Sequence, residues 1–281
     1  MLFFLISLWT AVAAPRVIAI GDIHADPEAA TATLKMANLI DESGHWSGGN
    51  AILIQTGDVT DKGPSSRGVI TLFTQLQKEA RAAGGDVIAV LGNHEVMNIV
   101  GDWRGVQEKD LADYDAPATR MADLRPRGVM GQWIHSAHMV VFHEDTVFVH
   151  GGVSAQMASI GREQLATIKA KHVGQSAMRA LFDSDGPMWY RGYLLADEEK
   201  ACTEIKQALA QLKARRMVMG HTTQEDGKIK TRCDGAIVGI DTGISAYAGH
   251  NFAALELING DARAIYPGQT IDLPDPKKSV D

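Results

Sequence analysis

Three short apolar runs near the start of the chain each end on a glycine followed by a polar residue that can bind a metal ion. The runs are RVIAI at 16–20, AILIQ at 51–55 and DVIAVL at 86–91. Helical patterns separate them at 26–40 and 65–85, and the second of these ends on two glycines. A strand, a helix and a further strand in succession are typical of a sheet covered by helices. The sequence therefore predicts an α/β domain with buried strands.

The remaining chain resumes this pattern after an interruption. Residues 100–135 are polar and irregular, which predicts a helical or loop insert at one end of the sheet. The segment 138–152 predicts two strands joined in a hairpin, and helices are expected from about 159 to 183 and at 200–216. Short strands alternate with turns after that.

No internal repeat or linker divides the mature chain. We therefore predict one domain over residues 14–268 and a flexible tail over 269–281.

The N-terminus combines an apolar run with the small-residue cleavage pattern AVA at 11–13. The run is too short to cross a bilayer as a helix. It predicts a secretory signal peptide over residues 1–13, and hence a periplasmic or secreted mature protein. Because no Lys or Arg precedes the run, a buried first strand and a misassigned start codon are the alternatives.

The chain has two cysteines, Cys202 and Cys233. In an oxidising compartment a disulfide between them would tie a helix to a later loop. The alternative is a pair of unpaired, partly buried thiols, because a sequence does not fix the separation of two Cα atoms. Their number and spacing do not indicate a cysteine-based metal site.

The charge of the chain argues against a nucleic-acid partner. The formal net charge is -7, and the only basic clusters are short, such as KARR and PKK. Nucleic-acid binding requires many cations that neutralise phosphates. A local electropositive pocket stays open, because a bound metal ion can outweigh the surrounding net charge.

Five predicted strands end on residues that bind metals. The ends carry GDIHAD, GDVTD, GNHE, HGG and GH, and four of them have a glycine just before the ligand-type residue. The side chains concerned are Asp22, His24, Asp58, Asp61, Asn93, His94, His150 and His221. Ligands bind at the ends of strands in open α/β sheets. Along an extended strand end, side chains repeat every two residues, so we expect Asp22 and His24 to point to the same side.

This set of oxygen and nitrogen ligands predicts a pair of divalent metal ions. Mixed carboxylate, amide and imidazole ligands fit Mn, Fe or Zn better than Ca or Mg. Two ions about 3.5–4 Å apart can generate a hydroxide and hold a phosphoryl group during displacement. Six further histidines have no such support and are expected on the surface or in packing: His45, His135, His138, His143, His172 and His250.

The ordered strings GDIHAD, GDVTDKG, GNHE, HGG and GHT resemble the calcineurin-like metallophosphoesterases, and within them the PPP-type phosphatase branch. The further strings GNHEVMNIVGD, GPMWYRGY, RMVMGHT and IDTGIS are similar to the bacterial Shewanella-like phosphatases. The resemblance covers residues 16–267. Thr223 stands where the broader superfamily often has a second histidine, which agrees with the PPP branch rather than the cyclic-nucleotide phosphodiesterases.

The resemblance implies a role for each motif residue. One metal would be held by Asp22, His24 and Asp58, and the other by Asp58, Asn93, His150 and His221, with Asp58 as the bridge. His94 would be the general acid, supported by Asp61. A histidine whose pKa is raised by a carboxylate suits this task.

The resemblance also implies cations for the substrate phosphate. Lys62 stands where the family has an arginine, and a lysine cannot form the same bidentate contact. Arg191 in WYRG resembles the family's other phosphate-binding arginine, although it could be a surface arginine stacked on an aromatic ring. Asn93 is a further candidate for this contact, and Arg104 is a weaker one.

Together these observations predict a sandwich of two mixed β-sheets flanked by helices, with the insert at the rim of the site. The expected activity is hydrolysis of phosphomonoesters by a metal-activated hydroxide, on a phosphorylated protein or a small ester. The choice among serine, threonine and tyrosine is open, and some relatives imply tyrosine. Two alternatives are a dinucleoside-tetraphosphate hydrolase and a catalytically silent metal-binding module. No nucleic-acid partner and no stable membrane insertion are expected.

Overall fold

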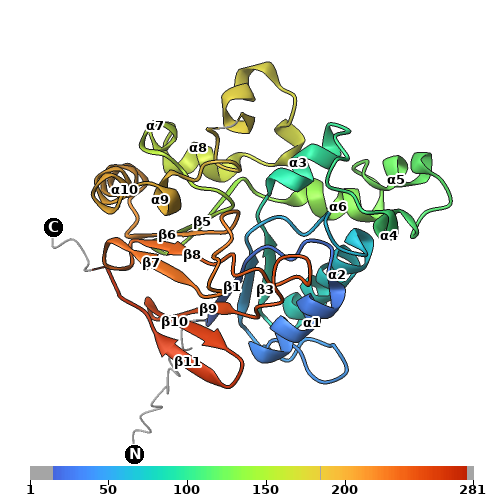
Figure 1. The fold of residues 1–281 in the computed structure, drawn as a ribbon, viewed down its shortest axis with the longest axis horizontal. Helices are drawn as coiled ribbons and strands as arrows, with labels where there is room; N and C mark the ends of the chain where they lie inside the picture. Colours follow the sequence, from blue (N-terminus) through green and yellow to red (C-terminus); the bar gives the residue numbers. More distant parts are fainter. Residues whose placement is uncertain (1–14, 184, 277–281) are drawn as a thin grey trace, which may run out of the picture.

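Two mixed β-sheets pack face to face and helices cover their outer sides (Figure 1). The structure is a computed structural model that describes residues 15–183 and 185–276. The predicted signal peptide at 1–13 lies outside the described residues. Among those residues, no helix combines the length and apolar character that crossing a membrane requires.

The first sheet contains six strands in the order β11-β10-β9-β1-β2-β3. Strands β1, β2 and β3 are parallel, and β9 runs antiparallel to β1. The strands are β1 (Val17–Ile20), β2 (Ile52–Gln55), β3 (Asp86–Ala89), β9 (Ala254–Ile258), β10 (Asp261–Tyr266) and β11 (Gln269–Asp272).

The second sheet contains five strands in the order β4-β5-β6-β8-β7. Strands β5, β6 and β8 are parallel, and the predicted hairpin is the antiparallel pair β4 and β5. The strands are β4 (Val140–His143), β5 (Thr146–Val149), β6 (Arg216–Met219), β7 (Lys230–Arg232) and β8 (Ile237–Gly239).

Alternation along β1 explains how the layers pack. Val17 and Ala19 lie in the core between the two sheets, whereas Ile18 and Ile20 lie in the core beneath the helices. All four side chains are buried. A strand buried on both faces reads as a continuous apolar run, which is why RVIAI lacks polar residues after Arg16.

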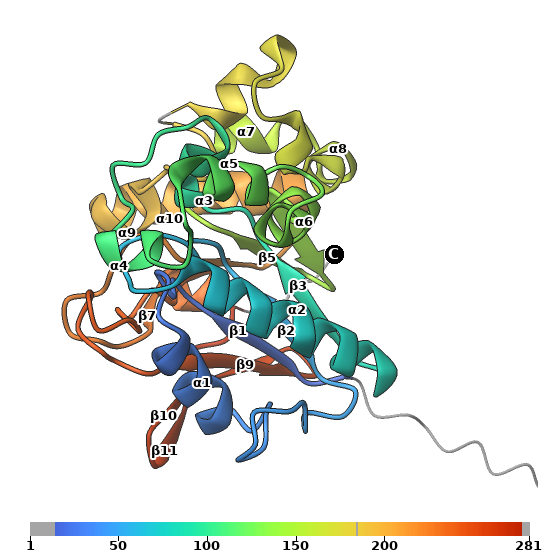
Figure 2. The same cartoon turned by 90° about the vertical axis from the view of Figure 1, so that its right-hand side faces the viewer.

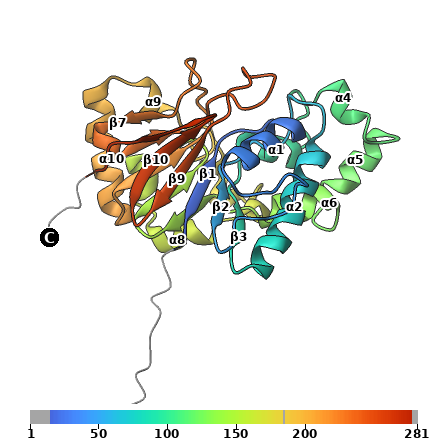
Figure 3. The same ribbon diagram turned by 90° about the horizontal axis from the view of Figure 1, so that it is seen from below.

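Helices α1 (Pro27–Met36) and α2 (Ser66–Ala82) lie on one outer side, and α9 (Gly192–Leu195) and α10 (Glu198–Leu212) lie on the other (Figure 3). Figure 2 shows α2 running across the face of β1, β2 and β3. Asp26 and Ser65 cap α1 and α2 by accepting hydrogen bonds from backbone N–H groups of the first turn. The two sheets with helices on both outer sides confirm the predicted fold class.

The insert over residues 100–135 is helical. It follows α3 (Asn93–Ile99) and carries α4 (Glu108–Leu111), α5 (Pro117–Asp123) and most of α6 (Val129–Ser136). Helices α4 and α5 lie at the edge of the molecule beyond α2 (Figure 1). The chain then returns to the second sheet at β4.

One prediction of local structure is wrong, and a second is confirmed only as a series of short helical segments. Residues 269–272 are not part of a flexible tail, because they form β11 and pair with β10 through four residues. The helical stretch expected from 159 to 183 consists of α8 (Arg162–Thr167) and two 3₁₀ segments, η1 (Ala170–His172) and η2 (Ser176–Phe182), and α7 (Ala155–Ala158) precedes it. Gly161 and Gly174 lie in this stretch with φ of +93° and +82°, which a continuous helix does not allow.

A disulfide joins Cys202 of α10 to Cys233, the first residue of the 3₁₀ segment η3 (Cys233–Gly235) that follows β7, with Cα atoms 5.4 Å apart. Of the two alternatives left open by the sequence, the structure therefore contains the bridge. Disulfides persist in oxidising compartments, which is the environment that the predicted export would provide.

Removing this disulfide should lower thermal stability. It closes a loop with a sequence separation of 31 residues, for which chain entropy gives about 3–4 kcal/mol of stabilisation. We expect the Cys202→Ser, Cys233→Ser double variant to unfold about 10 °C below the native protein, as followed by circular dichroism. Reductant should lower the melting temperature of the native protein only. Equal melting temperatures for the two proteins would contradict the assignment.

Candidate metal centre and active site

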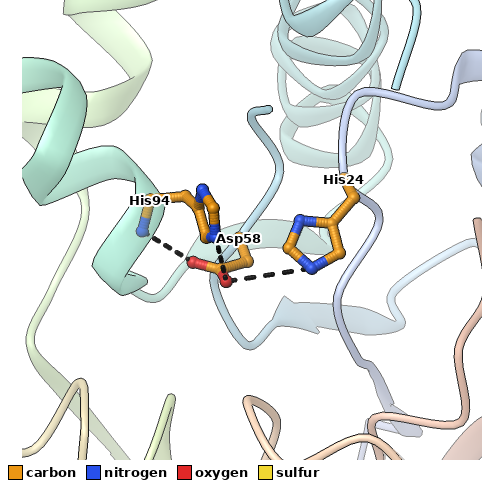
Figure 4. Close-up of side chains that lie close together, drawn as sticks. All are labelled: His24, Asp58 and His94. Atoms are coloured by element: carbon orange, nitrogen blue, oxygen red, sulfur yellow. Dashed lines mark hydrogen bonds and ion pairs between the residues drawn. The ribbon is translucent and has the colours of Figure 1, made fainter. Parts of the chain in front are cut away.

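Asp58 lies at the centre of a buried cluster of histidines at the carboxyl ends of the strands. Its Oδ2 lies 4.0 Å from Nε2 of His24 and 3.9 Å from Nε2 of His94. Figure 4 shows both rings directed at this carboxylate. Asp22 completes this side, with Oδ2 3.8 Å from Nε2 of His24.

The other oxygen of Asp58 faces a second group of ligands. Oδ1 lies 3.3 Å from Nε2 of His150, and the same nitrogen lies 2.9 Å from Oδ1 of Asn93. The ring of His221 lies 4.8 Å from that of His150. The predicted ligands from five strand ends therefore converge, and Asp58 faces both groups.

Backbone turns, rather than strand alternation, aim these side chains. Asp22 and His24 do point to the same site, with Oδ2 3.8 Å from Nε2, but the extended strand end that was expected to cause this is absent, since His24 has φ of +46°. Asp58 and His221 also lie in the left-handed region, with φ of +55° and +64°. Such values are uncommon for residues other than glycine, and they gather at functional sites.

The glycines before the ligands make room for the cluster. Gly57 has φ of +96°, and a Cβ there would lie 2.7 Å from Cα of Gly92. A Cβ at Gly92 would overlap Oδ1 of Asp58. A side chain at Gly57 would displace Gly92 and the ring of His150, and a side chain at Gly92 would displace the carboxylate of Asp58.

Glu95 shapes the loop that presents Asp58, and the sequence analysis did not assign it. Its Oε2 accepts hydrogen bonds from the backbone N–H groups of Asp58 (2.8 Å) and Gly92 (2.9 Å). Its Oε1 accepts from those of Val59 (3.0 Å) and Thr60 (3.1 Å). The sequence feature that could have identified Glu95 is its position three residues after Gly92, which is the spacing of a capping box.

Asp241 is a second residue that the sequence analysis did not assign. It follows β8 as the strand-end carboxylate of IDTG, accepts a hydrogen bond from the Thr223 hydroxyl (2.7 Å) and is buried. Burial raises the pKa of Asp22, and the neighbouring Asp241 raises it further. Asp241 thus adds negative charge to the Asp22 side of the cluster.

Burial sets the charge state of the histidines. It lowers the pKa of His24 to about 3 and that of His221 to about 2, so both rings are neutral and each has one nitrogen lone pair that can act as an acceptor. Burial also lowers the pKa of His150, but the carboxylates of Asp58 and Asp22 and the hydrogen bonds of the ring together raise it to about 10. Burial opposes the ionisation of Asp58, yet His150 holds its pKa well below the usual range.

The residues present fit divalent metal ions. Ligand atoms of His24, Asp58 and His94 lie within 4.8 Å of one another, and so do those of Asp58, His150 and His221. Bond lengths of about 2.0–2.2 Å to such ligands produce separations of this order. Nε2 of His221 is buried without a hydrogen-bond partner among the described residues. A cation would satisfy this nitrogen and the facing acceptors of Asp58 and Asn93.

His94 and Asp61 form a hydrogen-bonded pair beside the cluster. Nδ1 of His94 lies 2.8 Å from Oδ2 of Asp61, and Oδ1 of Asp61 accepts a hydrogen bond from Nδ2 of Asn98 (2.9 Å). Burial lowers the pKa of His94, but Asp58 and the hydrogen bond to Asp61 raise it above the ordinary value. With Nδ1 engaged by Asp61, Nε2 of His94 faces the cluster.

A cavity of about 500 Å³ opens over the cluster, and three cations line it. Arg191 contacts His221, one of the predicted metal ligands, because its Nη1 donates a hydrogen bond to the backbone carbonyl oxygen of that residue (2.7 Å). Arg104 is 83% exposed and forms an ion pair with Asp102 at the rim.

Lys62 also lines the cavity, and its Nζ donates a hydrogen bond to Nε2 of His24 (3.0 Å). Lys62 therefore contacts a predicted metal ligand as well as the space open to substrate. The six other histidines belong to neither described ligand group.

Comparisons with known proteins agree with this geometry. A sequence model of the family described as calcineurin-like phosphoesterase matches residues 15–225. The chain belongs to this family. An uncharacterized protein of Schizosaccharomyces pombe is 38% identical over 276 residues, which cover 92% of this chain and 82% of that protein. Shewanella-like protein phosphatase 2 of Arabidopsis thaliana is 30% identical, and the match covers 82% of this chain and 71% of the relative.

A solved structure shows the same similarity. The cold-active protein-tyrosine phosphatase of a psychrophilic Shewanella species superposes with a TM-score of 0.77 at 27% identity, covering 92% of this chain and 80% of that one. The predicted resemblance to Shewanella-like phosphatases is therefore confirmed. The chain is a metal-dependent phosphoester hydrolase, and its histidine and aspartate residues are arranged to bind metal.

Proposed function

We propose that this calcineurin-like phosphoesterase hydrolyses phosphomonoesters at a site for two divalent metal ions, and that its substrates are phosphorylated proteins. The observation that carries the proposal is Asp58, whose two carboxylate oxygens face two different groups of ligands. A carboxylate in this position can bridge two ions.

The residues that would hold the ions follow from the two groups. Asp22, His24 and Asp58 would hold one ion, and Asp58, Asn93, His150 and His221 would hold the other. Mn, Fe or Zn suits these mixed ligands. When bound, the ions supply Lewis-acid activation of water and of the phosphoryl group.

The protein's own proton donor would be His94. Asp61 holds its Nδ1, so Nε2 is the atom free to donate a proton to the ester oxygen that leaves. The proton neutralises the alkoxide or phenoxide as the P–O bond breaks. Arg191 and Lys62 line the same cavity and would bind the negative oxygens of the phosphate, with the amide of Asn93 close by.

A protein substrate is favoured by a second cavity beside the first. It is mostly apolar, has a volume of about 510 Å³, and shares Met97 and Trp189 with the cavity over the cluster. A small ester would leave this space empty, whereas a peptide could place an apolar side chain there. The similarity to a protein-tyrosine phosphatase favours phosphotyrosine.

A substrate panel tests this proposal. Purified protein supplied with Mn²⁺ would be assayed on peptides containing phosphotyrosine, phosphoserine or phosphothreonine, and on a dinucleoside tetraphosphate. We expect the highest kcat/KM on phosphotyrosine peptides with apolar neighbours. A preference for the dinucleoside tetraphosphate would replace the proposal, and no turnover of any ester would favour a catalytically silent module.

Replacing Lys62 should weaken substrate binding and leave the metals in place. Loss of a hydrogen bond to a charged group predicts a fall in kcat/KM of about 10- to 100-fold for Lys62→Ala, mainly through KM. Lys62→Arg should keep or raise activity, because arginine binds phosphate with two hydrogen bonds. The exposed Lys78 of α2 provides the matched control, Lys78→Ala. Loss of metal from Lys62→Ala, measured by elemental analysis, would instead assign Lys62 to the metal centre.

A further inference from the structure

The insert packs directly against the pair formed by His94 and Asp61. A Cβ at Gly105 would lie 2.8 Å from Oδ2 of Asp61 and 2.9 Å from Cε1 of His94. The carbonyl oxygen of Gly105 also accepts a hydrogen bond from the backbone N–H of Lys62 (2.9 Å). The insert therefore touches the proposed proton donor and its carboxylate partner, as well as lining the mouth of the cavity.

A fully buried arginine of the insert lies beside this pair. Nη2 of Arg120, in α5, lies 3.7 Å from Oδ1 of Asp61 and 3.3 Å from Oδ2 of Asp110. The guanidinium carbon lies 4.9 Å from the centre of the Trp103 ring. Arg120 thus approaches the oxygen of Asp61 that does not bind His94.

Asp110 connects the same arginine to the loop that carries Asp61. Its Oδ2 accepts a hydrogen bond from the Ser66 hydroxyl (2.8 Å), and the Ser66 oxygen in turn accepts one from the backbone N–H of Asp61 (3.1 Å). Both the side chain and the backbone of Asp61 are therefore linked to Arg120 and Asp110 of the insert.

Packing alone does not explain a buried arginine here. Burying a charged group costs more than burying an apolar side chain of similar size, unless excellent hydrogen bonds compensate. Nε and Nη1 of Arg120 have no hydrogen-bond partner among the described residues. An apolar residue at this position alone would leave the buried carboxylates of Asp61 and Asp110 without a compensating cation, so the charge of Arg120 acts on the carboxylate of Asp61.

We propose that Arg120 is a positioning residue for proton donation. Its guanidinium and the amide of Asn98 hold Oδ1 of the Asp61 carboxylate between them. The other oxygen of Asp61, Oδ2, therefore stays hydrogen-bonded to Nδ1 of His94. This directs Nε2 of His94 at the leaving oxygen. In the step that it supports, water adds its oxygen to phosphorus and releases one proton to the solvent, the P–O bond to the leaving group breaks, and the proton of Nε2 passes to the leaving oxygen. Nε2 then takes a proton back from the solvent. The inference rests on the proposed function of His94.

Leaving-group dependence separates positioning from stability. Phenyl phosphate needs a proton on its leaving oxygen, whereas 2,4-dinitrophenyl phosphate departs readily without one. We expect Arg120→Met to lower kcat on phenyl phosphate about 10- to 100-fold, the usual range for a residue that orients a catalytic group. The loss on the dinitrophenyl ester should be less than about 3-fold, with KM and metal content unchanged.

Arg216 of β6 provides a matched control, because it is also fully buried but bonds to Gly235, Gly260 and Asp275, none of which belongs to the site. Arg216→Met should lower the melting temperature and keep the native ratio of rates on the two esters. An equal loss on both esters for Arg120→Met, or no loss on either, would overturn the proposal.

Two further measurements cover the remaining outcomes. If Arg120→Met does not fold, Arg120→Lys decides, since a lysine keeps the charge but cannot reach Asp61 and Asp110 together. If the ratio of kcat on the two esters differs from that of the native protein, the positioning role is supported. A ratio equal to the native one overturns the proposal. If His94→Asn itself loses both esters equally, the general-acid role has failed, which distinguishes failure of the proposed function from failure of this inference.

Discussion

Asp58→Asn should abolish phosphatase activity, with a fall in kcat of about 10³-fold or more on an aryl phosphate supplied with Mn²⁺. An amide offers one neutral oxygen where Asp58 now directs two charged oxygens at two groups of ligands. The negative charge that lies between His24, His94 and His150 would also be lost. We therefore expect elemental analysis to find at most one tightly bound metal ion per chain.

The control for this prediction is Asp115→Asn, because Asp115 is an exposed carboxylate of the insert. It should match the native protein in rate, metal content and melting temperature. Full activity of Asp58→Asn, or turnover by the native protein in excess chelator, would contradict a metal-dependent reaction at this site. Circular dichroism would show whether Asp58→Asn loses its folded structure together with its activity. In that case the metal content of the variant is the remaining test.

The fold was predictable because apolar runs and glycines mark its central strands. RVIAI and AILIQ are buried on both faces, so their apolar character is continuous and easily recognised. Strand β11 was missed because all four of its residues are exposed, and it carries little apolar pattern. Its pairing with β10 depends on the turn at Pro267 and Gly268, a signal of a hairpin that hydrophobic periodicity does not contain.

The candidate site was predictable where residues follow strands. Parallel strands bring their carboxyl ends to one edge, so Asp22, Asp58 and Asn93 had to lie near one another. Arg120 carries no such signal, and Glu95 carries only the spacing of a capping box, three residues after Gly92. Glu95 acts by accepting hydrogen bonds from a loop 35 to 37 residues earlier in the chain, and Arg120 acts through tertiary packing of a short helix in a polar segment. Contacts of this kind depend on the folded arrangement rather than on local spacing.

His94→Asn should separate the chemistry of proton donation from metal binding. An asparagine side chain at this position could not donate a proton as an imidazolium does, and we expect kcat on phenyl phosphate to fall about 10²- to 10⁴-fold. Metal content should equal that of the native protein, because the variant leaves unchanged the residues that we propose hold the ions: Asp22, His24, Asp58, Asn93, His150 and His221. The metal content matters because His94 is itself close enough to be a metal ligand: its ring nitrogen lies within 4.8 Å of the ligand atoms of His24 and Asp58.

Two outcomes therefore distinguish the two chemical roles of His94. If it is the proton donor, activity on 2,4-dinitrophenyl phosphate should largely survive while activity on phenyl phosphate is lost. If it is a metal ligand, the metal content should fall and both esters should lose activity together. The hydrogen bond from Nδ1 to Asp61 favours the first outcome, because a buried carboxylate raises the pKa of the ring and keeps a proton available to the atom that faces the substrate.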